Sequence, residues 1–403
     1  MPRLRRPVLL SLLALVALLV MVPAATAQTA ERQVPFGFFG TTLATELTVS
    51  SVVGDAALEE QTALMASSGV ESLRAVIAWS TVEPARGFYD FTSTDRLAAA
   101  AARHGLVFLP NISSSPQWAS RGASTPEFFR YPPTDPTDYA NLMRQMVGRY
   151  GPRGTFWAQN PGLPRRPIRQ WQIWNEQSAD FFWKRPSPSQ ASWARGYTQL
   201  LKESYQAIKG ADPGATVVAG ALVGSGTYSP WAAMRDLYRA NARRWFDVIG
   251  VHPFTQNPRS ARDTVAQTLE IVRRVRREMR SRRDARKEII LTEMTWPASV
   301  GSVPREAILG LETTPRGQAQ RLRLAYRELA RERRRLRVTQ AYWFTWASDY
   351  DALGAPSVMS FRYTGLTRFT GGVFSRKPLL RTYSDLAARY EGCRKTADAR
   401  RCL

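Results

Sequence analysis

Hydrophobic residues along the chain form short continuous runs that alternate with longer segments of helical periodicity. Runs of this kind indicate strands buried on both faces, and the segments between them indicate amphipathic helices. Eight such strand–helix repeats follow one another between residues 34 and 390. The predicted strands are 34–39, 70–79, 106–112, 167–175, 215–221, 246–252, 288–292 and 338–346. The predicted helices are 56–67, 93–104, 136–150, 189–209, 230–240, 261–280, 317–334 and 379–390.

This repeat predicts an α/β fold, a (β/α)8 TIM barrel in which helices cover parallel strands, because eight units close such a barrel. The alternative is a doubly wound open sheet. The segment after the first strand, residues 39–43, lacks the glycine spacing of a phosphate-binding turn and so favours the barrel. No stretch rich in proline, serine and glycine divides the chain, and we expect a single domain over residues 28–392.

The first 27 residues have the organisation of a secretory signal peptide. Three arginines within residues 3–6 precede an apolar stretch of 15 residues, 8–22, and Ala-Thr-Ala at 25–27 forms a small-residue cleavage signature. The apolar stretch is shorter than the roughly 20 residues that span a bilayer, which favours cleavage over an uncleaved anchor. We therefore expect a secreted protein, extracellular or associated with the cell envelope, with no transmembrane segment in the mature chain.

The chain has two cysteines, and both lie in the tail, residues 393–403. In an oxidising compartment Cys393 and Cys402 are expected to form a small disulfide loop, and two free thiols on a frayed tail are the alternative. With two histidines, His104 and His252, the sequence has too few ligands for a Cys/His zinc site. We expect no metal and no cofactor.

Polar and aromatic residues mark the C-terminal ends of the predicted strands, where the active sites of (β/α)8 barrels lie. Glu176 and Glu293, on the fourth and seventh strands, would both point into one bowl. Glycoside hydrolysis requires such a pair of carboxyl groups. Each glutamate alone is weak evidence, because a glutamate near a helix start is also favoured by the helix dipole. The candidate strand-end residues are Arg74, Asn111, Asn175, Glu176, His252, Glu293 and Trp346.

Two sequence motifs carry a family resemblance: Trp-Gln-Ile-Trp-Asn-Glu at 171–176 and Ile-Leu-Thr-Glu-Met-Thr-Trp at 290–296. Supporting matches are Arg74, Glu-Pro-x-x-Gly-x-Tyr-Asp-Phe at 83–91 and Gly-Val-His-Pro-Phe at 250–254. The sequence resembles clan A of the glycoside hydrolases, which are retaining (β/α)8 enzymes with their catalytic pair on strands four and seven. Within the clan it is most similar to family 39 and its neighbours, over essentially the whole mature chain.

The resemblance implies a role for each polar residue at the strand ends. Glu176 would be the general acid/base and Glu293 the nucleophile. Asn175 would bind the sugar 2-hydroxyl, and Arg74 would keep Glu293 ionised. His252 would contact a carboxylate or a sugar hydroxyl, with a purely structural histidine as the alternative.

Aromatic residues near the strand ends are candidate sugar platforms. Trp346 would stack under the sugar in the cleavage subsite. Trp118, Trp183 and Trp296 follow strands three, four and seven and could form further platforms, with ordinary loop packing as the alternative. Asn111 is a plausible polar contact, although a structural hydrogen bond explains it nearly as well. Long loops at 113–133, 295–315 and 347–376 favour an open cleft for polysaccharide.

Arginine dominates the charge of the chain: the net charge is +23, with 50 arginines against 6 lysines. The basic runs at 273–277 and 331–337 lie near the C-terminal ends of two predicted helices, opposite the expected catalytic bowl. There they complement the helix dipoles and are expected to be solvated. Electrostatic contact with acidic cell-envelope polymers is the main alternative, and specific nucleic-acid binding is not expected.

The sequence thus predicts an exported, monomeric, retaining β-glycoside hydrolase that cleaves a β-linked polysaccharide or oligosaccharide by double displacement. The alternative from another class is a non-catalytic carbohydrate-binding barrel associated with the cell envelope. A basic structural protein of the envelope is a third interpretation.

Overall fold

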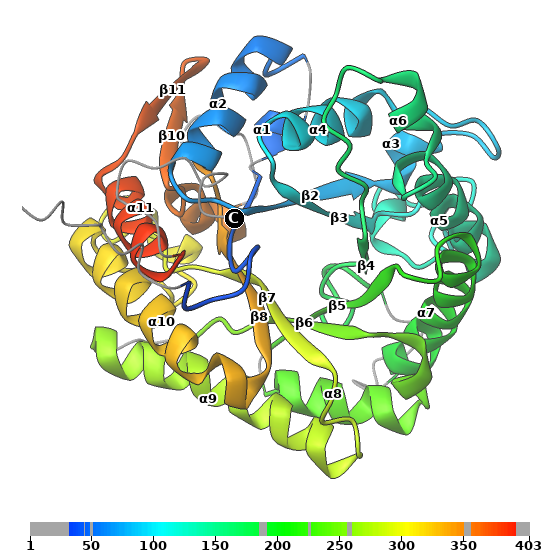
Figure 1. The fold of residues 1–403 in the computed structure, drawn as a ribbon. Coiled ribbons are helices and arrows are strands. Elements are labelled where there is room, and N and C mark those ends of the chain that lie inside the picture. The colour runs from blue at the N-terminus through cyan, green and yellow to red at the C-terminus, as the bar shows by residue number, and fades with distance from the viewer. Residues whose placement is uncertain are drawn as a thin grey trace, which may run out of the picture.

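The computed structural model describes residues 32–391 apart from residues 44, 49–50, 185–191, 225–226, 256–259 and 350–355. Eight parallel strands, β1 to β8, close a barrel in sequence order, and the longer helices surround it (Figure 1). The predicted TIM barrel is therefore confirmed. The predicted signal peptide and the tail with Cys393 and Cys402 lie outside the described residues and stay predictions.

The barrel strands are almost entirely buried, as expected for a parallel sheet that lies between a packed interior and a layer of helices. The barrel closes where β1 pairs with β8, from Phe39 opposite Ala341 to Thr42 opposite Phe344. The strands are β1 Phe39–Thr42, β2 Ser72–Ala78, β3 Val107–Ser113, β4 Gln170–Ile173, β5 Thr216–Val223, β6 Val248–His252, β7 Glu288–Met294 and β8 Val338–Phe344.

The outer helices begin at sequence signals that are easily recognised. Asp135, Ser229 and Thr314 each accept a hydrogen bond from a backbone N–H in the first turn of a helix that starts with proline. None of the helices in the described ranges combines the length and apolarity needed to cross a bilayer. The longer helices are α2 Asp55–Ser67, α4 Thr92–Arg103, α5 Pro136–Tyr150, α7 Ser192–Ala211, α8 Pro230–Arg239, α9 Ala261–Ser281, α10 Pro315–Leu336 and α11 Pro378–Glu391. Short helical turns are α1 Thr45–Thr48, α3 Trp79–Val82, α6 Thr155–Gln159, η1 Phe128–Arg130, η2 Ala242–Trp245, η3 Arg305–Ala307 and η4 Pro356–Tyr363.

Six predicted strands agree with the observed ones to within two residues at each end, and the first and fourth differ more. The first was predicted over 34–39 but begins at Phe39, because Gly37 has φ +88° and the Phe38 N–H bonds back to the Pro35 carbonyl in a turn. The fourth was predicted to reach residue 175 but ends at Ile173, where the backbone leaves the extended conformation. In both cases a local change in backbone conformation excludes part of the hydrophobic run from the strand.

A second, three-stranded sheet lies in the segment after β8, where the sequence had indicated only a long loop. It consists of β9 Ala347–Asp349, β10 Thr367–Thr370 and β11 Val373–Arg376. The β10–β11 hairpin turns at Gly371 and Gly372, whose φ angles of +56° and +77° suit glycine at a two-residue turn. The hairpin lies beside α2 on the outside of the barrel (Figure 1).

The basic run on α9 is not entirely solvated, contrary to the sequence-based expectation. Arg276 is 1% exposed and donates hydrogen bonds of 2.9 Å to the carbonyls of Leu336 and Lys287. Arg273 pairs with Glu332 of α10 at 2.7 Å. Part of the arginine excess therefore joins α9 to α10 and to the chain entering β7, because a buried cation requires hydrogen-bond acceptors.

Candidate active site

Arg74 on β2 is the centre of a buried network at the C-terminal ends of the strands. Its Nε donates to Gln172 Oε1, its Nη1 to Glu293 Oε1 and its Nη2 to Asn175 Oδ1, each at 2.8 Å. The guanidinium is fully buried, and a charge in that position requires such partners. Arg74 therefore fixes side chains from the ends of β4 and β7 relative to β2. Gln172 was not among the predicted site residues.

The chain leaves β4 through two residues in the left-handed region, Trp174 at φ +64° and Glu176 at φ +44°. Such angles cost a non-glycine residue about 1–3 kcal/mol, and they persist only where surrounding contacts enforce them. Here the Trp174 N–H donates to the Ile112 carbonyl at 2.9 Å and its indole to the Phe182 carbonyl at 2.8 Å. The exit from β4 is thereby held in the conformation that places Glu176 against His252.

Glu176, His252 and Glu293 converge at the mouth of the barrel. His252 Nδ1 lies 2.6 Å from Glu176 Oε1 and 3.6 Å from Glu293 Oε2. One oxygen of each carboxyl group and a ring nitrogen all lie within 4.8 Å of one another. One oxygen of Glu176 and one of Glu293 thus lie at most 4.8 Å apart, which agrees with the ~5–5.5 Å between the carboxyl groups of retaining glycosidases.

Burial gives the three groups different protonation behaviour. It raises the pKa of Glu176 to about 7, and the positive charge of Arg74 opposes the rise. Burial also raises the pKa of Glu293, against the lowering effects of His252 and Arg74. It lowers the pKa of His252 to about 3, so the imidazole is neutral near pH 7. Of the two carboxyl groups, Glu176 is the one placed to carry a proton near neutral pH, because Glu293 has the direct hydrogen bond from Arg74.

These three residues are also a group whose ligand atoms lie close enough to hold a metal ion. The positive charge of Arg74, 2.8 Å from Glu293, already compensates one carboxylate and would repel a cation. The arrangement thus suits carboxyl chemistry better than metal coordination.

Asn111 and Asn175 both belong to the Arg74 network. Asn175 Oδ1 accepts from Asn111 Nδ2 at 3.3 Å as well as from Arg74. With the oxygen and nitrogen of its side-chain amide exchanged, Asn111 donates to the Trp174 carbonyl at 2.9 Å and accepts from Arg74 Nη2 at 2.8 Å. Either way Asn111 supports Arg74 and the end of β4, which favours the structural interpretation of this residue.

Three of the four tryptophans expected as sugar platforms are buried instead. Trp346 is 0% exposed, and its indole donates to Gln61 of α2 at 3.0 Å. Trp183 and Trp296 are 2% and 1% exposed, the former packed against Trp174 at 5.3 Å between ring centroids. The structure thus corrects the expectation of open platforms at these positions. Strand-end placement was read from the sequence, but the direction of each ring depends on the packing of neighbouring elements.

Trp118 is half-buried, and Arg86 covers one side of its ring at 4.5 Å from the centroid. Its indole donates to the Glu83 carbonyl at 3.0 Å. The Glu83 carboxyl accepts from the Trp79 indole at 2.7 Å and from the Gly87 N–H at 2.8 Å. The Glu-Pro-x-x-Gly motif therefore shapes the loop after β2, and Trp118 packs on that loop.

An aromatic cluster beside His252 was missed in the sequence. The ring centroid of Phe254 lies 5.7 Å from that of His252 and 5.8 Å from that of Phe361. The ring centroid of Phe344 lies 5.7 Å from that of Phe361. All three phenylalanines are partly exposed. Phe344 is the last residue of β8, so the aromatic residue at that strand end is Phe344 and not Trp346. Placing the end of β8 two residues earlier would have found it.

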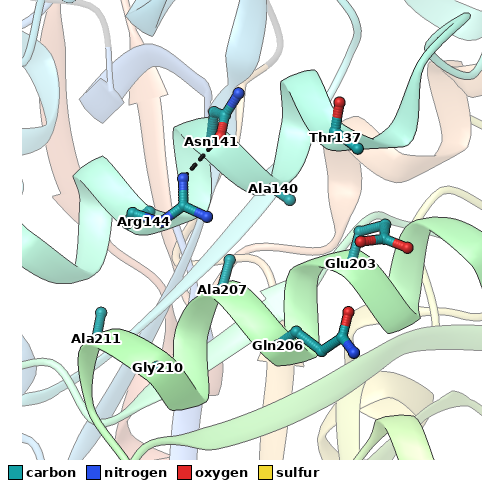
Figure 2. Close-up of a pocket in the computed structure, with 9 residues that line it drawn as sticks. All are labelled: Thr137, Ala140, Asn141, Arg144, Glu203, Gln206, Ala207, Gly210 and Ala211. Carbon is teal, nitrogen blue, oxygen red and sulfur yellow. Dashed lines mark hydrogen bonds between the residues drawn. The ribbon is translucent and has the colours of Figure 1, made fainter.

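A hollow of about 470 Å³ lies on the outer wall of the barrel, between α5 and α7 (Figure 2). Small residues such as Ala140, Ala207 and Gly210 allow the two helices to approach there, while Glu203 and Gln206 point to its rim. It contains no residue of the Arg74 network. The hollow is therefore separate from the Arg74 network at the barrel mouth.

Comparison with known proteins finds glycoside hydrolases with a similar fold. A family model described as β-galactosidase, of glycoside hydrolase family 42, matches residues 52–136. A family 39 glycoside hydrolase from Bacteroides cellulosilyticus WH2 has a similar structure, with TM-score 0.59, 19% identity and coverage of 88% of this chain and 64% of that one. The solved structures share the (β/α)8 barrel with this chain, and the family model matches one part of it. The resemblance predicted from the sequence is thereby confirmed.

Two further solved structures have comparable folds. A GH5_18 protein from Bifidobacterium longum subsp. longum shares TM-score 0.59 and 16% identity, covering 88% of this chain and 80% of that one. The exo-β-1,4-mannosidase Op5Man5 from Opitutaceae bacterium strain TAV5 shares TM-score 0.58 and 16% identity, covering 88% and 59%. The chain thus spans about two thirds of the family 39 protein and less of the mannosidase. No curated protein matches the chain.

Proposed function

We propose that this protein is a retaining β-glycoside hydrolase in which Glu293 is the nucleophile and Glu176 the general acid/base. The observation that carries the proposal is the close pairing of two buried carboxyl groups in different electrostatic surroundings. Their side chains remain 12% and 9% exposed, so both can reach a substrate at the barrel mouth. A proton donor beside an ionised carboxylate is the combination that retention requires.

In the first step the Glu293 carboxylate attacks the anomeric carbon and the glycosidic C–O bond breaks. The leaving-group oxygen receives the proton of Glu176, and a covalent glycosyl ester forms on Glu293. In the second step ionised Glu176 removes a proton from water. The water oxygen then attacks the anomeric carbon and releases Glu293, so the product has the configuration of the substrate.

The surrounding residues position these two groups. Arg74 holds Glu293 ionised by its charge and hydrogen bond, and it holds Asn175 by the amide oxygen. The Asn175 amide nitrogen can then donate to a sugar hydroxyl. Neutral His252, 2.6 Å from Glu176, can accept the acid's proton in a hydrogen bond or donate to the carboxylate once the proton has left.

The substrate class proposed is a β-linked glycoside, in keeping with the β-galactosidase family model and the β-mannosidase among the similar structures. Export through the N-terminal signal sequence is part of the same proposal, with an extracellular poly- or oligosaccharide as a target. The alternative is a carbohydrate-binding barrel without turnover. The short distance between the two carboxyl groups favours the enzyme, because binding alone does not need it.

The test compares wild type, Glu176→Gln and Glu293→Gln on a panel of β-linked polysaccharides and alkyl β-glycosides, whose leaving groups need the proton of the acid. We expect both variants to lose at least about a hundredfold in kcat/KM while retaining sugar binding. Glu306→Gln, an exposed substitution outside the site, is the matched control. Proton NMR of the first-released anomer checks retention. Unchanged turnover in either variant, or an inverted first product, contradicts the proposal.

A further inference from the structure

Three exposed hydrophobic side chains from different segments gather in one pocket at the barrel mouth. Val76 of β2, Phe129 of η1 and Phe181 after β4 are 45%, 43% and 50% exposed. They line a cavity of about 110 Å³ that also contains Asn175. Exposed hydrophobic residues scattered singly are ordinary, but several that converge in a hollow beside a reaction centre mark a ligand site. We name it the Phe129–Phe181 pocket.

The two loops that form the pocket are joined to each other. The Arg130 guanidinium lies 4.3 Å above the Phe181 ring, and its Nε donates to the Phe181 carbonyl at 2.6 Å. The Lys184 N–H donates to the Arg130 carbonyl at 2.9 Å. These contacts fix Phe129 and Phe181 relative to each other, so the pocket is formed before a ligand arrives.

The exposed lining of the pocket is mainly apolar, although four polar residues also line it: Ser113, Ser114, Arg130 and Asn175. Trp174 and Phe182 add to the aromatic part of the wall, with 4.8 Å between the ring centroids of Phe182 and Phe181. The Asn175 oxygen is already bound by Arg74, and Arg130 is paired with Glu127. A sugar ring carries hydroxyl groups on most of its edge and would lose hydrogen bonds with water here, whereas an apolar ring would not. For comparison, a closed cavity of about 150 Å³ holds one benzene molecule. The volume of this pocket, about 110 Å³, is therefore on the scale of a single ring.

The position of the pocket indicates which part of a glycoside it receives. Its wall includes Trp174 and Asn175 immediately before Glu176, and Phe181 a few residues after it. No residue of β7, which carries Glu293, lines it. The proton donor of a glycosidase faces the leaving-group oxygen, so the leaving group lies on the Glu176 side of the scissile bond.

We propose that the Phe129–Phe181 pocket binds an apolar aglycone, so that the preferred substrates are β-glycosides with an aryl or cycloalkyl leaving group. This inference rests on the proposed glycosidase function. It replaces the open polysaccharide cleft expected from the loop lengths as the main determinant of specificity next to the scissile bond.

The experiment uses matched methyl and cyclohexyl β-glycosides of glucose, galactose and mannose. Methanol and cyclohexanol are leaving groups of similar basicity, so a difference in kcat/KM reports apolar contact and not leaving-group chemistry. Wild type is expected to prefer the cyclohexyl glycoside by about 10- to 100-fold, the range in which apolar pockets discriminate. Phe129→Ala and Phe181→Ala should reduce that preference to within about threefold and leave the methyl glycoside nearly unaffected.

Two further variants separate loss of the pocket from loss of the fold. Phe181→Leu keeps an apolar side chain and should restore most of the preference. Phe88→Ala removes a phenylalanine that is 64% exposed but does not line the pocket, and it should keep the full preference. Equal kcat/KM values for the two wild-type substrates, or a preference unchanged in both alanine variants, overturns the inference.

A binding measurement distinguishes failure of the pocket from failure of the proposed function. Isothermal titration calorimetry with each glycoside reports binding directly, without assigning a signal to one of the 12 tryptophans. Tighter binding of cyclohexyl than of methyl glycosides, lost in Phe181→Ala, supports the pocket even if no glycoside is hydrolysed. Equal binding overturns the pocket even if hydrolysis confirms the glycosidase.

Discussion

The barrel holds two pairs of buried glutamates, one at each end, and only one pair is arranged for chemistry. At the mouth Glu176 and Glu293 share Arg74 and His252. At the opposite end Glu71, directly before β2, pairs with Arg32, and Glu391 at the end of α11 lies buried nearby. Both pairs have pKa values raised by burial, and each has one arginine that opposes the rise.

The difference lies in what the carboxyl groups can still contact. The side chain of Glu71 is 0% exposed and accepts from the Gly37 N–H at 2.8 Å as well as from Arg32. Those bonds tie the segment before β1 to the start of β2. The mouth pair keeps a small exposed fraction beside a pocket. A perturbed pKa therefore indicates burial, and access to a ligand decides whether it indicates catalysis.

Substitution of one glutamate from each pair should give the largest difference in kcat/KM. Glu176→Gln should reduce kcat/KM on alkyl glycosides by about 10²–10⁴-fold, the usual contribution of general acid catalysis. Glu71→Gln should leave kcat/KM within about threefold, because its contacts are structural. Steady-state kinetics at pH 6 measures both. A comparable loss in Glu71→Gln would show that the two ends of the barrel are not independent.

The two arginines should differ in their contribution to stability. Arg74→Met leaves a buried carboxylate without its partner and should cost about 3–5 kcal/mol in the free energy of unfolding. Arg32→Met should cost less, because the side chain of Arg32 is 22% exposed. Urea denaturation followed by circular dichroism compares them. Arg74→Met should also move the acid limb of the pH–rate profile upward, since Glu293 loses the charge that lowers its pKa.

The pH profile tests the assignment of Glu176. As the acid it must be protonated in the free enzyme, so kcat/KM should fall as pH rises through about 7. At low pH the rate should fall again as Glu293 becomes protonated and loses its nucleophilic form. With an activated aryl glycoside that needs no proton donor, Glu176→Gln should lack the alkaline limb. Persistence of that limb in the variant would assign it to another group.

The smallest expected effect is on the stability of the folded protein, through Glu391 at the end of the barrel opposite the mouth. Burial raises the pKa of Glu391 to about 9, so the folded state binds a proton that the unfolded chain releases above about pH 4.5. Stability is therefore lost as pH rises from about 4.5 to about 9. Glu391→Gln removes this loss and should raise the melting temperature at pH 8 by several degrees, with a smaller difference near pH 4. A variant that is less stable at both pH values would contradict this.

The sequence alone predicted the barrel, its eight strands and the convergence of two glutamates. Hydrophobic runs and helix caps are local signals: α5 was predicted over 136–150 and is observed over Pro136–Tyr150, with Asp135 as its cap. A barrel of known strand order places the ends of β4 and β7 at one mouth, so the carboxyl pair followed from strand positions. These features depend on residues close together in the chain.

Tertiary structure alone decided which side chains face the site. The predicted platform Trp346 is buried against Gln61 of α2, while Phe344 is partly exposed at the end of β8. Phe129 and Phe181 meet in one pocket although 52 residues separate them. Side-chain direction depends on contacts between distant segments and on backbone angles such as those of Trp174 and Glu176. Periodicity in a sequence contains neither. It therefore predicted that Glu176 and Glu293 lie together without defining the pocket beside them.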